Sequence, residues 1–250
     1  DNSGNISSLA SGEYVMQAHE KGLKVWGLVD NFNENMNTKE VLSKTSSRQN
    51  LENRLITYAL KVGMDGINVD FESLSEGVGI HFLQFLRELS IQCHANNLVL
   101  SVDNPVPEDF TSHYDRAEQG VVADYVIIMG YDEHYVGSDA GSVASLPWVE
   151  QGVKDTLSEV AAQRTILAIP FYTRLWTGNG DNASSRAMGI YEATKWVLES
   201  GMDLTWDDSV GQYYGRLDSQ NGEQQLWMEE TRSLGLKMDL IKKYDLAGVA

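Results

Sequence analysis

The sequence predicts an α/β fold of the (β/α)8 barrel type. Short apolar runs rich in β-branched residues recur along the chain, and segments with helical periodicity lie between them. This alternation is typical of parallel strands joined by helices. Polar residues gather where the apolar runs end, and a barrel carries its active site at the C-terminal ends of its strands. These three observations together favour a barrel.

Seven segments are predicted as strands. They are Leu23–Asp30, Gly66–Glu72, Leu98–Asp103, Tyr125–Asp132, Ile166–Tyr172, Gln224–Glu229 and Leu246–Ala250. Because a full barrel has eight strands, the expectation is a barrel truncated at its first strand and at the end of its last strand. A doubly wound sheet is the alternative fold. No glycine-rich phosphate motif follows a predicted strand, which disfavours its nucleotide-binding form.

Six segments are predicted as helices because their apolar residues recur at helical spacing. They are Gly12–Lys21, Ser47–Val62, Gly79–Asn96, Leu146–Val160, Ile190–Ser200 and Thr231–Tyr244. In the third of these, Phe82, Phe85, Leu86 and Leu89 form one stripe that should cover a sheet. The Gly-, Asn-, Asp- and Ser-rich stretch 177–186 predicts a loop.

Composition narrows the choice of partner. The chain has 250 residues, 42% of them hydrophobic, and is interpreted as a single domain over residues 1–250. Its formal net charge of −17 disfavours nucleic acids and anionic membranes and suits a neutral or amino-sugar polymer. No apolar run approaches the roughly 20 residues of a membrane span. The five histidines lack metal-ligand spacing, which disfavours a metal site, and we expect a monomer.

The run from Asp65 to Glu72 reads Asp-Gly-Ile-Asn-Val-Asp-Phe-Glu. On a strand, Asn68, Asp70 and Glu72 point to one face and the apolar residues between them to the other. Carboxylates are poor strand formers and repel each other there, whereas a carboxyl pair can divide acid and base roles. Glu72, at the end of the strand, is the natural proton donor. A solvated acidic face on an edge strand is the alternative.

Further candidates for the site lie at the other predicted strand ends. The polar pairs there are Asp30 and Asn31, Asp103 and Asn104, Tyr131 and Asp132, Tyr172 and Arg174, and Glu229 and Glu230. The candidate substrate contacts are Asn31, Asp65, Asn104, Asp132, Tyr172, Arg174, Trp227 and Glu229. Trp227 could stack on a sugar or pack in the core, and Arg174 could bind substrate or form a structural ion pair.

The Asp65–Glu72 run resembles the signature of glycoside hydrolase family 18, the chitinase family, in which three aspartates precede the catalytic glutamate. Met129-Gly-Tyr-Asp132 resembles the Met-x-Tyr-Asp element of that family, and Ile169-Pro-Phe-Tyr-Thr-Arg174 resembles its Pro-Phe-Tyr-Gly-Arg element. The three segments stand in the order of the family, and the resemblance covers nearly the whole chain.

The middle aspartate of the series is Asn68 in this chain. Asparagine there is similar to the branch that contains bacterial spore cortex-lytic and germination N-acetylglucosaminidases, whose substrates are peptidoglycan glycans. Other phrases also look like that branch: 24–32, 132–135, 142–148 and 225–230. This resemblance implies a bacterial protein that is secreted or associated with the cell envelope or the spore.

The resemblance implies a retaining, substrate-assisted hydrolysis that needs no metal and no organic cofactor. Glu72 would protonate the glycosidic oxygen, Asp70 would stabilise an oxazolinium intermediate, and Asn68 would orient Asp70. Tyr131 would donate a hydrogen bond to the acetamido oxygen, and Asp132 would bind the sugar or hold Tyr131. The alternatives are a chitinase, an endo-β-N-acetylglucosaminidase acting on other glycans, and a chitinase-like protein that only binds carbohydrate. The presence of Glu72 favours an enzyme.

Overall fold

The computed structural model describes residues 1–178, 183–220 and 222–250. Their contacts group the chain into two compact units. The first unit comprises residues 1–127 and 156–165, and the second comprises residues 128–155 and 166–250. The interpretation of residues 1–250 as a single domain stays a prediction.

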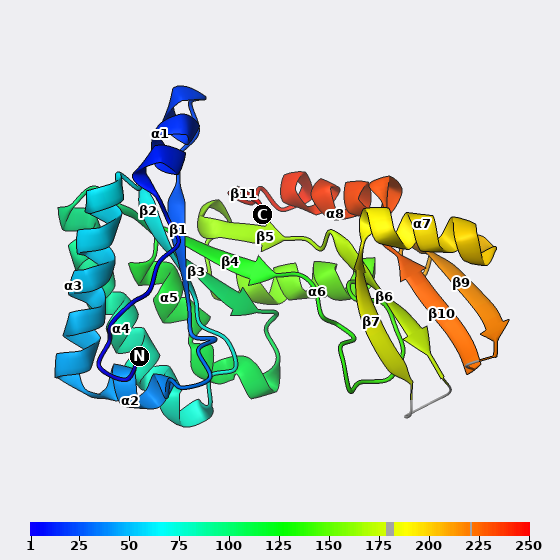
Figure 1. Cartoon of the computed structure of the whole chain (residues 1–250), viewed down its shortest axis with the longest axis horizontal. Helices are drawn as coiled ribbons and strands as arrows, with labels where there is room; N and C mark the ends of the chain where they lie inside the picture. The colour runs from blue at the N-terminus through cyan, green and yellow to red at the C-terminus, as the bar shows by residue number, and fades with distance from the viewer. Residues whose placement is uncertain (179–182, 221) are drawn as a thin grey trace. The chain divides into compact units, whose positions relative to one another are not determined.

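A six-stranded sheet contains six of the seven predicted strands (Figure 1). Its strand order is β1 (Trp26–Asp30), β2 (Gly66–Asp70), β3 (Val99–Pro105), β4 (Tyr125–Met129), β5 (Thr165–Ala168) and β11 (Gly248–Val249). The pairs β1–β2, β2–β3 and β5–β11 are parallel, as predicted. Closure into an eight-stranded barrel stays a prediction, and so does truncation at the first strand and at the end of the last strand.

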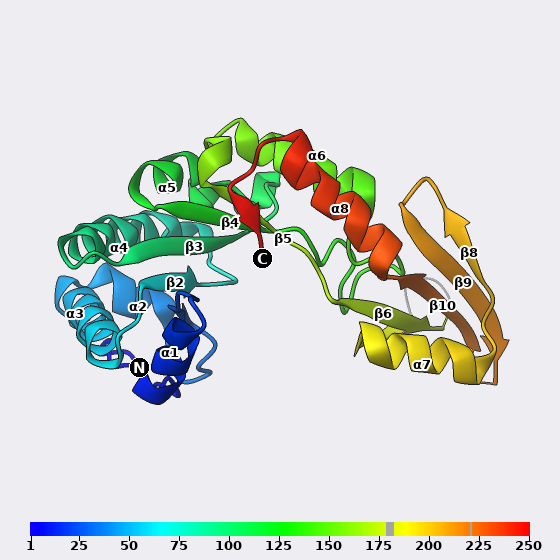
Figure 2. The same cartoon turned by 90° about the horizontal axis from the view of Figure 1, so that it is seen from above.

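Three predicted helices of the first unit are confirmed as α1 (Gly12–Glu20), α3 (Thr45–Val62) and α4 (Glu76–Ala95). The helices α3 and α4 pack beside each other and against strands β2 and β3 (Figure 2). The short elements α2 (Thr38–Ser43), η1 (Asp109–Tyr114) and α5 (Arg116–Val122) were not predicted, because six or seven residues are too few to show a helical period.

Apolar packing holds the end of β2 against α4. Phe71 stacks on Phe82 and Phe85, with ring centroids 5.9 Å and 5.7 Å apart. Phe82, Phe85, Leu86 and Leu89, the predicted stripe, are completely buried. Because side chains alternate along a strand, this packing turns the polar residues of β2 to the opposite face.

The second unit contains a five-stranded antiparallel sheet. Its strand order is β7 (Ser184–Gly189), β6 (Tyr172–Thr177), β10 (Gly222–Met228), β9 (Gln212–Ser219) and β8 (Leu204–Asp207). The expectation that Gln224–Glu229 is a parallel barrel strand is therefore wrong, because this segment forms most of β10. Residues 179–182 of the predicted loop lie outside the described residues, whereas the start of β7 falls within it.

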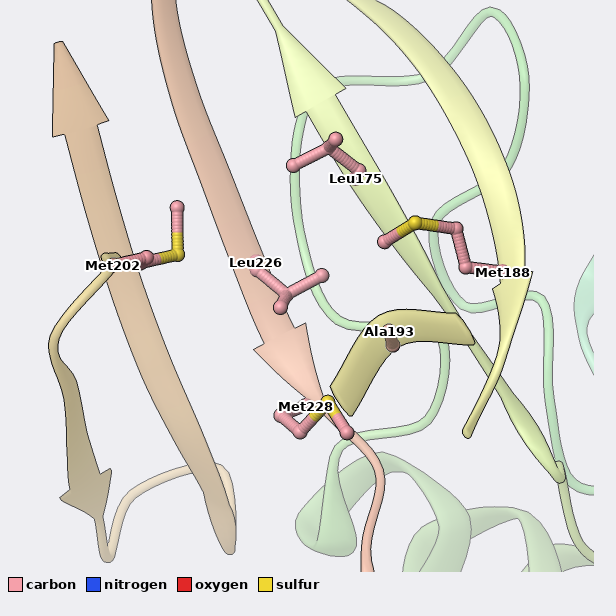
Figure 3. Packing of buried hydrophobic residues seen from close by; sticks show 6 residues of the cluster. All are labelled: Leu175, Met188, Ala193, Met202, Leu226 and Met228. Carbon is pink, nitrogen blue, oxygen red and sulfur yellow. The ribbon is translucent and has the colours of Figure 1, made fainter. Parts of the chain in front are cut away.

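One face of this second sheet is covered by α7 (Ile190–Ser200). Figure 3 shows Leu175, Met188, Leu226 and Met228 from three strands meeting Ala193 of α7. Along β10, Leu226 and Met228 point into this cluster while Gln225 and Trp227 alternate with them. Such alternation is typical of an antiparallel sheet with one covered face.

Two further predicted helices are confirmed in α6 (Leu146–Leu157) and α8 (Thr231–Lys243), along with α7. The side chain of Glu230 caps α8 by accepting hydrogen bonds from the backbone N–H groups of Arg232 and Ser233. Among the described helices, none combines the length and the apolar character that crossing a membrane requires.

Candidate active site

The acidic end of β2 lies between the ends of β1 and β3. Asp30 of β1 is paired in register with Asp70 of β2. Burial, and secondarily the negative charge of Asp30, raises the pKa of Asp70 above its usual range. Within the described residues, Oδ1 of Asp70 is buried and has no hydrogen-bond partner. A buried carboxylate oxygen without a donor is costly, so Asp70 is well suited to a ligand that brings one.

The backbone of Glu72 is held by the side chain of Asn31. Oδ1 of Asn31 accepts a hydrogen bond from the N–H of Glu72 at 2.9 Å, and its Nδ2 donates to the carbonyl oxygen of Glu72 at 2.9 Å. The same Nδ2 also donates to Oγ1 of Thr38 at 3.1 Å. Because both amide protons and the oxygen of Asn31 are used within the protein, its predicted substrate contact is better explained as support for Glu72.

The turn that follows Glu72 is fixed as well. Ser73 adopts a left-handed backbone conformation with φ of 53°. The hydroxyl group of Tyr114 donates to the carbonyl oxygen of Phe71 and accepts from the N–H of Leu74, both at 3.4 Å. Glu72 is therefore presented from a backbone that is bonded on both sides.

With Glu72 as the predicted proton donor, we expect Asn31→Ala to lower kcat at least about tenfold, because a small displacement of the Glu72 carboxyl would weaken proton transfer. KM should change less, since Asn31 does not point a free polar group at substrate. Steady-state kinetics on a soluble N-acetylglucosamine oligomer would measure this split between kcat and KM.

Asn37→Ala is the matched control for that variant. Asn37 lies in the same segment, and its side chain caps α2 by accepting from the N–H of Glu40 at 3.1 Å. Its loss should lower the free energy of unfolding by about 1 kcal/mol and leave kcat unchanged. An equal loss of kcat in both variants would show that Asn31 only stabilises the segment.

Asn68 is bonded to strand β3. Its Nδ2 donates to Oγ of Ser101 at 2.9 Å and to Oδ1 of Asp103 at 3.0 Å. Asn68 is predicted to orient Asp70, but these amide hydrogen bonds go to the neighbouring strand instead. Burial raises the pKa of Asp103 to about 6, and the charges of Asp70 and Glu72 act in the same direction.

Asp103 is one of the polar residues at the predicted strand ends, but it is not among the predicted site residues. The signal that could have identified it is register. Asn68 pairs with Ser101 and Val69 pairs with Val102, so the next step along the two strands brings Asp70 beside Asp103. Strand pairing cannot be read from one strand alone, which explains the omission.

Two other candidates have structural partners. Asp65 precedes β2 at the opposite end of the strand from Glu72, where Oδ2 accepts from the N–H of Val25 at 2.7 Å and lies 2.8 Å from Nε2 of His19. Asn104 is completely buried and exchanges two hydrogen bonds with Gln119, at 2.6 Å and 3.1 Å. Neither arrangement supports the predicted contact with substrate, because these polar groups are satisfied within the protein.

Four of the candidate site residues lie close together within the second unit. Tyr131 and Tyr172 make an edge-to-face contact with ring centroids 6.2 Å apart. The hydroxyl group of Tyr172 donates to Oδ1 of Asp132, and Arg174 lies 3.9 Å from the same oxygen. Asp132 has a left-handed backbone with φ of 63°. Asp132 is predicted to bind sugar or to hold Tyr131. The structure adds that Asp132 accepts a hydrogen bond from Tyr172, which contacts Tyr131.

Glu229 is a buried structural residue. Its side chain and that of Lys237 are completely buried, and Nζ of Lys237 donates to Oε1 of Glu229 at 2.7 Å. Ser233 donates to the other carboxylate oxygen at 2.7 Å, and Gln212 donates to Oε1 at 2.5 Å. The prediction that Glu229 contacts substrate is therefore not supported. Burial of the whole carboxylate leaves substrate no access to it.

Trp227 is half-buried on the face of the second sheet opposite α7. Its ring lies against Tyr214 with centroids 4.8 Å apart, and the hydroxyl group of Tyr214 donates to Oε1 of Gln225 at 3.2 Å. Aromatic rings beside amide groups on a sheet suit the apolar faces and hydroxyl groups of sugars. Stacking of Trp227 on substrate stays a prediction.

No group of three or more His, Cys, Asp or Glu residues with the geometry of a metal site occurs in the part of the chain that the structure describes. The first unit offers a carboxyl group on a fixed backbone, Glu72, and the neighbouring carboxyl group of Asp70, whose Oδ1 lacks a hydrogen-bond partner within the described ranges. Such a pair can supply a proton and stabilise a cation.

Comparisons with known proteins agree with this chemistry. The uncharacterized glycosylase YvbX of Bacillus subtilis is 25% identical over 263 residues, which cover all of this chain and 76% of the relative. The putative sporulation-specific glycosylase YdhD of the same organism is 26% identical over 84% of this chain. The cortical fragment-lytic enzyme of B. subtilis is 23% identical over 84%. The chain spans about half, 51%, of the latter two relatives.

Solved structures share the fold. The crystal structure of B. subtilis YdhD matches with a TM-score of 0.93 and 24% identity, covering 99% of this chain and 86% of that one. A chitinase from Chromobacterium violaceum matches with a TM-score of 0.90 and 25% identity, covering 99% and 81%. The family model of the glycosyl hydrolases family 18 matches residues 10–250. The chain therefore belongs to glycosyl hydrolase family 18 and is a glycosidase.

Proposed function

We propose that this glycosidase cleaves β-linked N-acetylglucosamine in peptidoglycan or a related amino-sugar polymer, with retention of configuration. The observation that carries the proposal is the end of β2, where Asn31 fixes the backbone of Glu72 and where Oδ1 of Asp70 has no hydrogen-bond partner among the residues that the structure describes. Family membership supports hydrolysis of amino-sugar polymers as the general reaction.

In the proposed first step, Glu72 donates its proton to the glycosidic oxygen as the bond from that oxygen to the anomeric carbon breaks. The acetamido oxygen of the substrate forms a bond to the anomeric carbon, giving an oxazolinium ion. Asp70 accepts a hydrogen bond from the acetamido N–H and stabilises the positive charge. Asp70 is only partly buried, and its Oδ1 has no partner in the part of the chain that the structure describes, which supports this role.

In the second step, Glu72 takes a proton from water, and the water oxygen attacks the anomeric carbon from the side that the leaving group occupied. The oxazolinium ring opens and regenerates the acetamido group, so configuration is retained. Within the second unit, Tyr131 is the predicted hydrogen-bond donor to substrate, and Tyr172 with Asp132 supports Tyr131. The edge-to-face contact of the two tyrosines is the observation that supports this last role.

The names of the relatives guide the choice of substrate. The cortical fragment-lytic enzyme and the sporulation-specific glycosylase favour spore peptidoglycan as substrate and the spore or cell envelope as location. A chitinase is the second candidate function, favoured by the match to the C. violaceum chitinase, which is 25% identical. Both candidates use the same reaction at Glu72.

Product analysis by mass spectrometry tests the proposal. The protein would be incubated in parallel with purified spore cortex peptidoglycan and with chitooligosaccharides, beside the Glu72→Gln variant as a blank. We expect muropeptides with reducing-end N-acetylglucosamine to be released only when Glu72 is present. Cleavage of chitooligosaccharides alone would assign the chitinase function instead. No cleavage of either polymer would contradict both and favour carbohydrate binding without catalysis.

A further inference from the structure

The strand register places Asp103 beside Asp70. The pairs Asn68–Ser101 and Val69–Val102 run in step along β2 and β3. Because side chains alternate, Asp70 and Asp103 follow on the same face as Asn68 and Ser101. The hydrogen bond from Nδ2 of Asn68 to Oδ1 of Asp103, 3.0 Å long, confirms that Asp103 points along this face.

Negative groups surround this pair within the first unit. The charges that act on Asp103 are those of Asp70 and Glu72. The charge of Asp30 in β1 raises the pKa of Asp70 from the other side. The charges of Asp70 and Glu72 also raise the pKa of the Tyr114 phenol group in η1. Two adjacent carboxyl groups in such a place do not ionise independently, so protons leave the pair in steps.

Asp103 is the member of the pair that a neutral amide holds in place. Asn68 can donate to Oδ1 of Asp103 whether Asp103 is protonated or ionised, because Oδ1 is an acceptor in both forms. Asp70, in contrast, has a buried oxygen without a partner among the described residues and is the group left for substrate. The two carboxyl groups therefore have different tasks.

We propose that Asp103 is a positioning residue of the active site, whose carboxylate, held beside Asp70 by Asn68, strengthens the stabilisation of the cationic intermediate at Asp70. This inference rests on the proposed function. Ionised Asp103 adds a second negative charge next to Asp70, and this charge stabilises the oxazolinium ion more than the neutral substrate.

The variant Asp103→Asn tests this role because asparagine resembles the protonated form at every pH and still accepts a hydrogen bond from Asn68. At pH 5, where Asp103 of the wild type is mostly protonated, kcat/KM of the two proteins should be within about twofold. At pH 7.5 the wild type should be about tenfold faster, since loss of one neighbouring charge is worth about one pKa unit. The ratio should rise with a midpoint near pH 6.

Ser101→Ala is the matched control. It removes the other acceptor of Asn68 and leaves every charge in place. Its ratio to the wild type should be the same at pH 5 and pH 7.5, whatever its size. If the Asp103→Asn ratio is equally constant with pH, Asp103 has only a structural role and the inference is overturned.

A second measurement does not depend on activity. Carbon-13 NMR of the aspartate carboxyl groups should show one group titrating near pH 6 that is absent in Asp103→Asn. In Asp70→Asn this group should titrate at lower pH, because the neighbouring negative charge is gone. Titration of Asp103 below pH 5 in the wild type, or an unchanged midpoint in Asp70→Asn, would refute the coupling. If the protein cleaves no glycan, the proposed function and the positioning role of Asp103 are both refuted, whereas NMR still decides the coupling between Asp70 and Asp103.

Discussion

Replacing Glu72 by glutamine is expected to lower kcat/KM by at least about 10²-fold, the usual contribution of a general acid. Glutamine has nearly the shape of glutamate but cannot give a proton to the glycosidic oxygen or take one from water. The backbone bonds to Asn31 do not involve the Glu72 side chain, so the variant should keep the wild-type position of the turn. Steady-state kinetics and urea unfolding, measured on the same preparations, check both parts.

Glu76→Gln is the matched control for Glu72→Gln. Glu76 lies four residues further along in the first turn of α4 and is exposed, so the substitution removes the same charge from the same region. It should cost at most about 1 kcal/mol of helix stability and leave kcat/KM unchanged. Turnover of the Glu72→Gln variant close to that of the wild type would remove Glu72 as the acid. The carboxyl groups at the end of β2 would then need a role other than acid catalysis by Glu72.

The largest effect on stability is expected from Lys237→Met. Lys237 and Glu229 are completely buried, so removing the ammonium group leaves a buried carboxylate whose remaining donors among the described residues are Ser233 and Gln212. Breaking a buried ion pair by removing one partner typically costs about 3–5 kcal/mol. We expect a loss of that size in the free energy of unfolding at pH 8, measured by urea denaturation.

The loss should depend on pH. Burial already raises the pKa of Glu229, while Lys237 opposes the rise. Without Lys237 the folded-state pKa rises further, so proton uptake stabilises the folded variant and the deficit should shrink as pH falls from 8 to 5. A deficit that is the same at both pH values would show that the lost packing of the lysine side chain, not the unpaired charge, dominates.

Two further variants complete this test. The double variant Lys237→Met with Glu229→Gln removes both charges and should be more stable than Lys237→Met alone. Lys242→Met is the control on the same helix, because Lys242 is 85% exposed and only 3.8 Å from Asp239. An exposed pair of this kind contributes little, so its loss should change the free energy of unfolding by less than about 1 kcal/mol.

Periodicity was sufficient for much of the fold. The stripe Phe82, Phe85, Leu86 and Leu89 marked a helix and also its buried face, since an apolar stripe must cover something. The segment Gln224–Glu229 shows what periodicity could not predict. Leu226, Trp227 and Met228 are apolar in succession and suit either kind of sheet, and only pairing with β6 and β9 makes the strand antiparallel.

The candidate site, like the fold, could be predicted only in part from the sequence. Residue types and spacing predicted that Asn68, Asp70 and Glu72 share a face, because the period of a strand is local geometry. In the structure β2 contains Asn68 and Asp70, and Glu72 follows two residues after its end. Contacts between strands were decided by the tertiary structure: Asn31 holds Glu72, Asn68 bonds to Asp103, and Glu229 turns inward to Lys237. A single sequence contains no record of which distant residue stands beside another, since register and burial arise only when the strands and helices pack together.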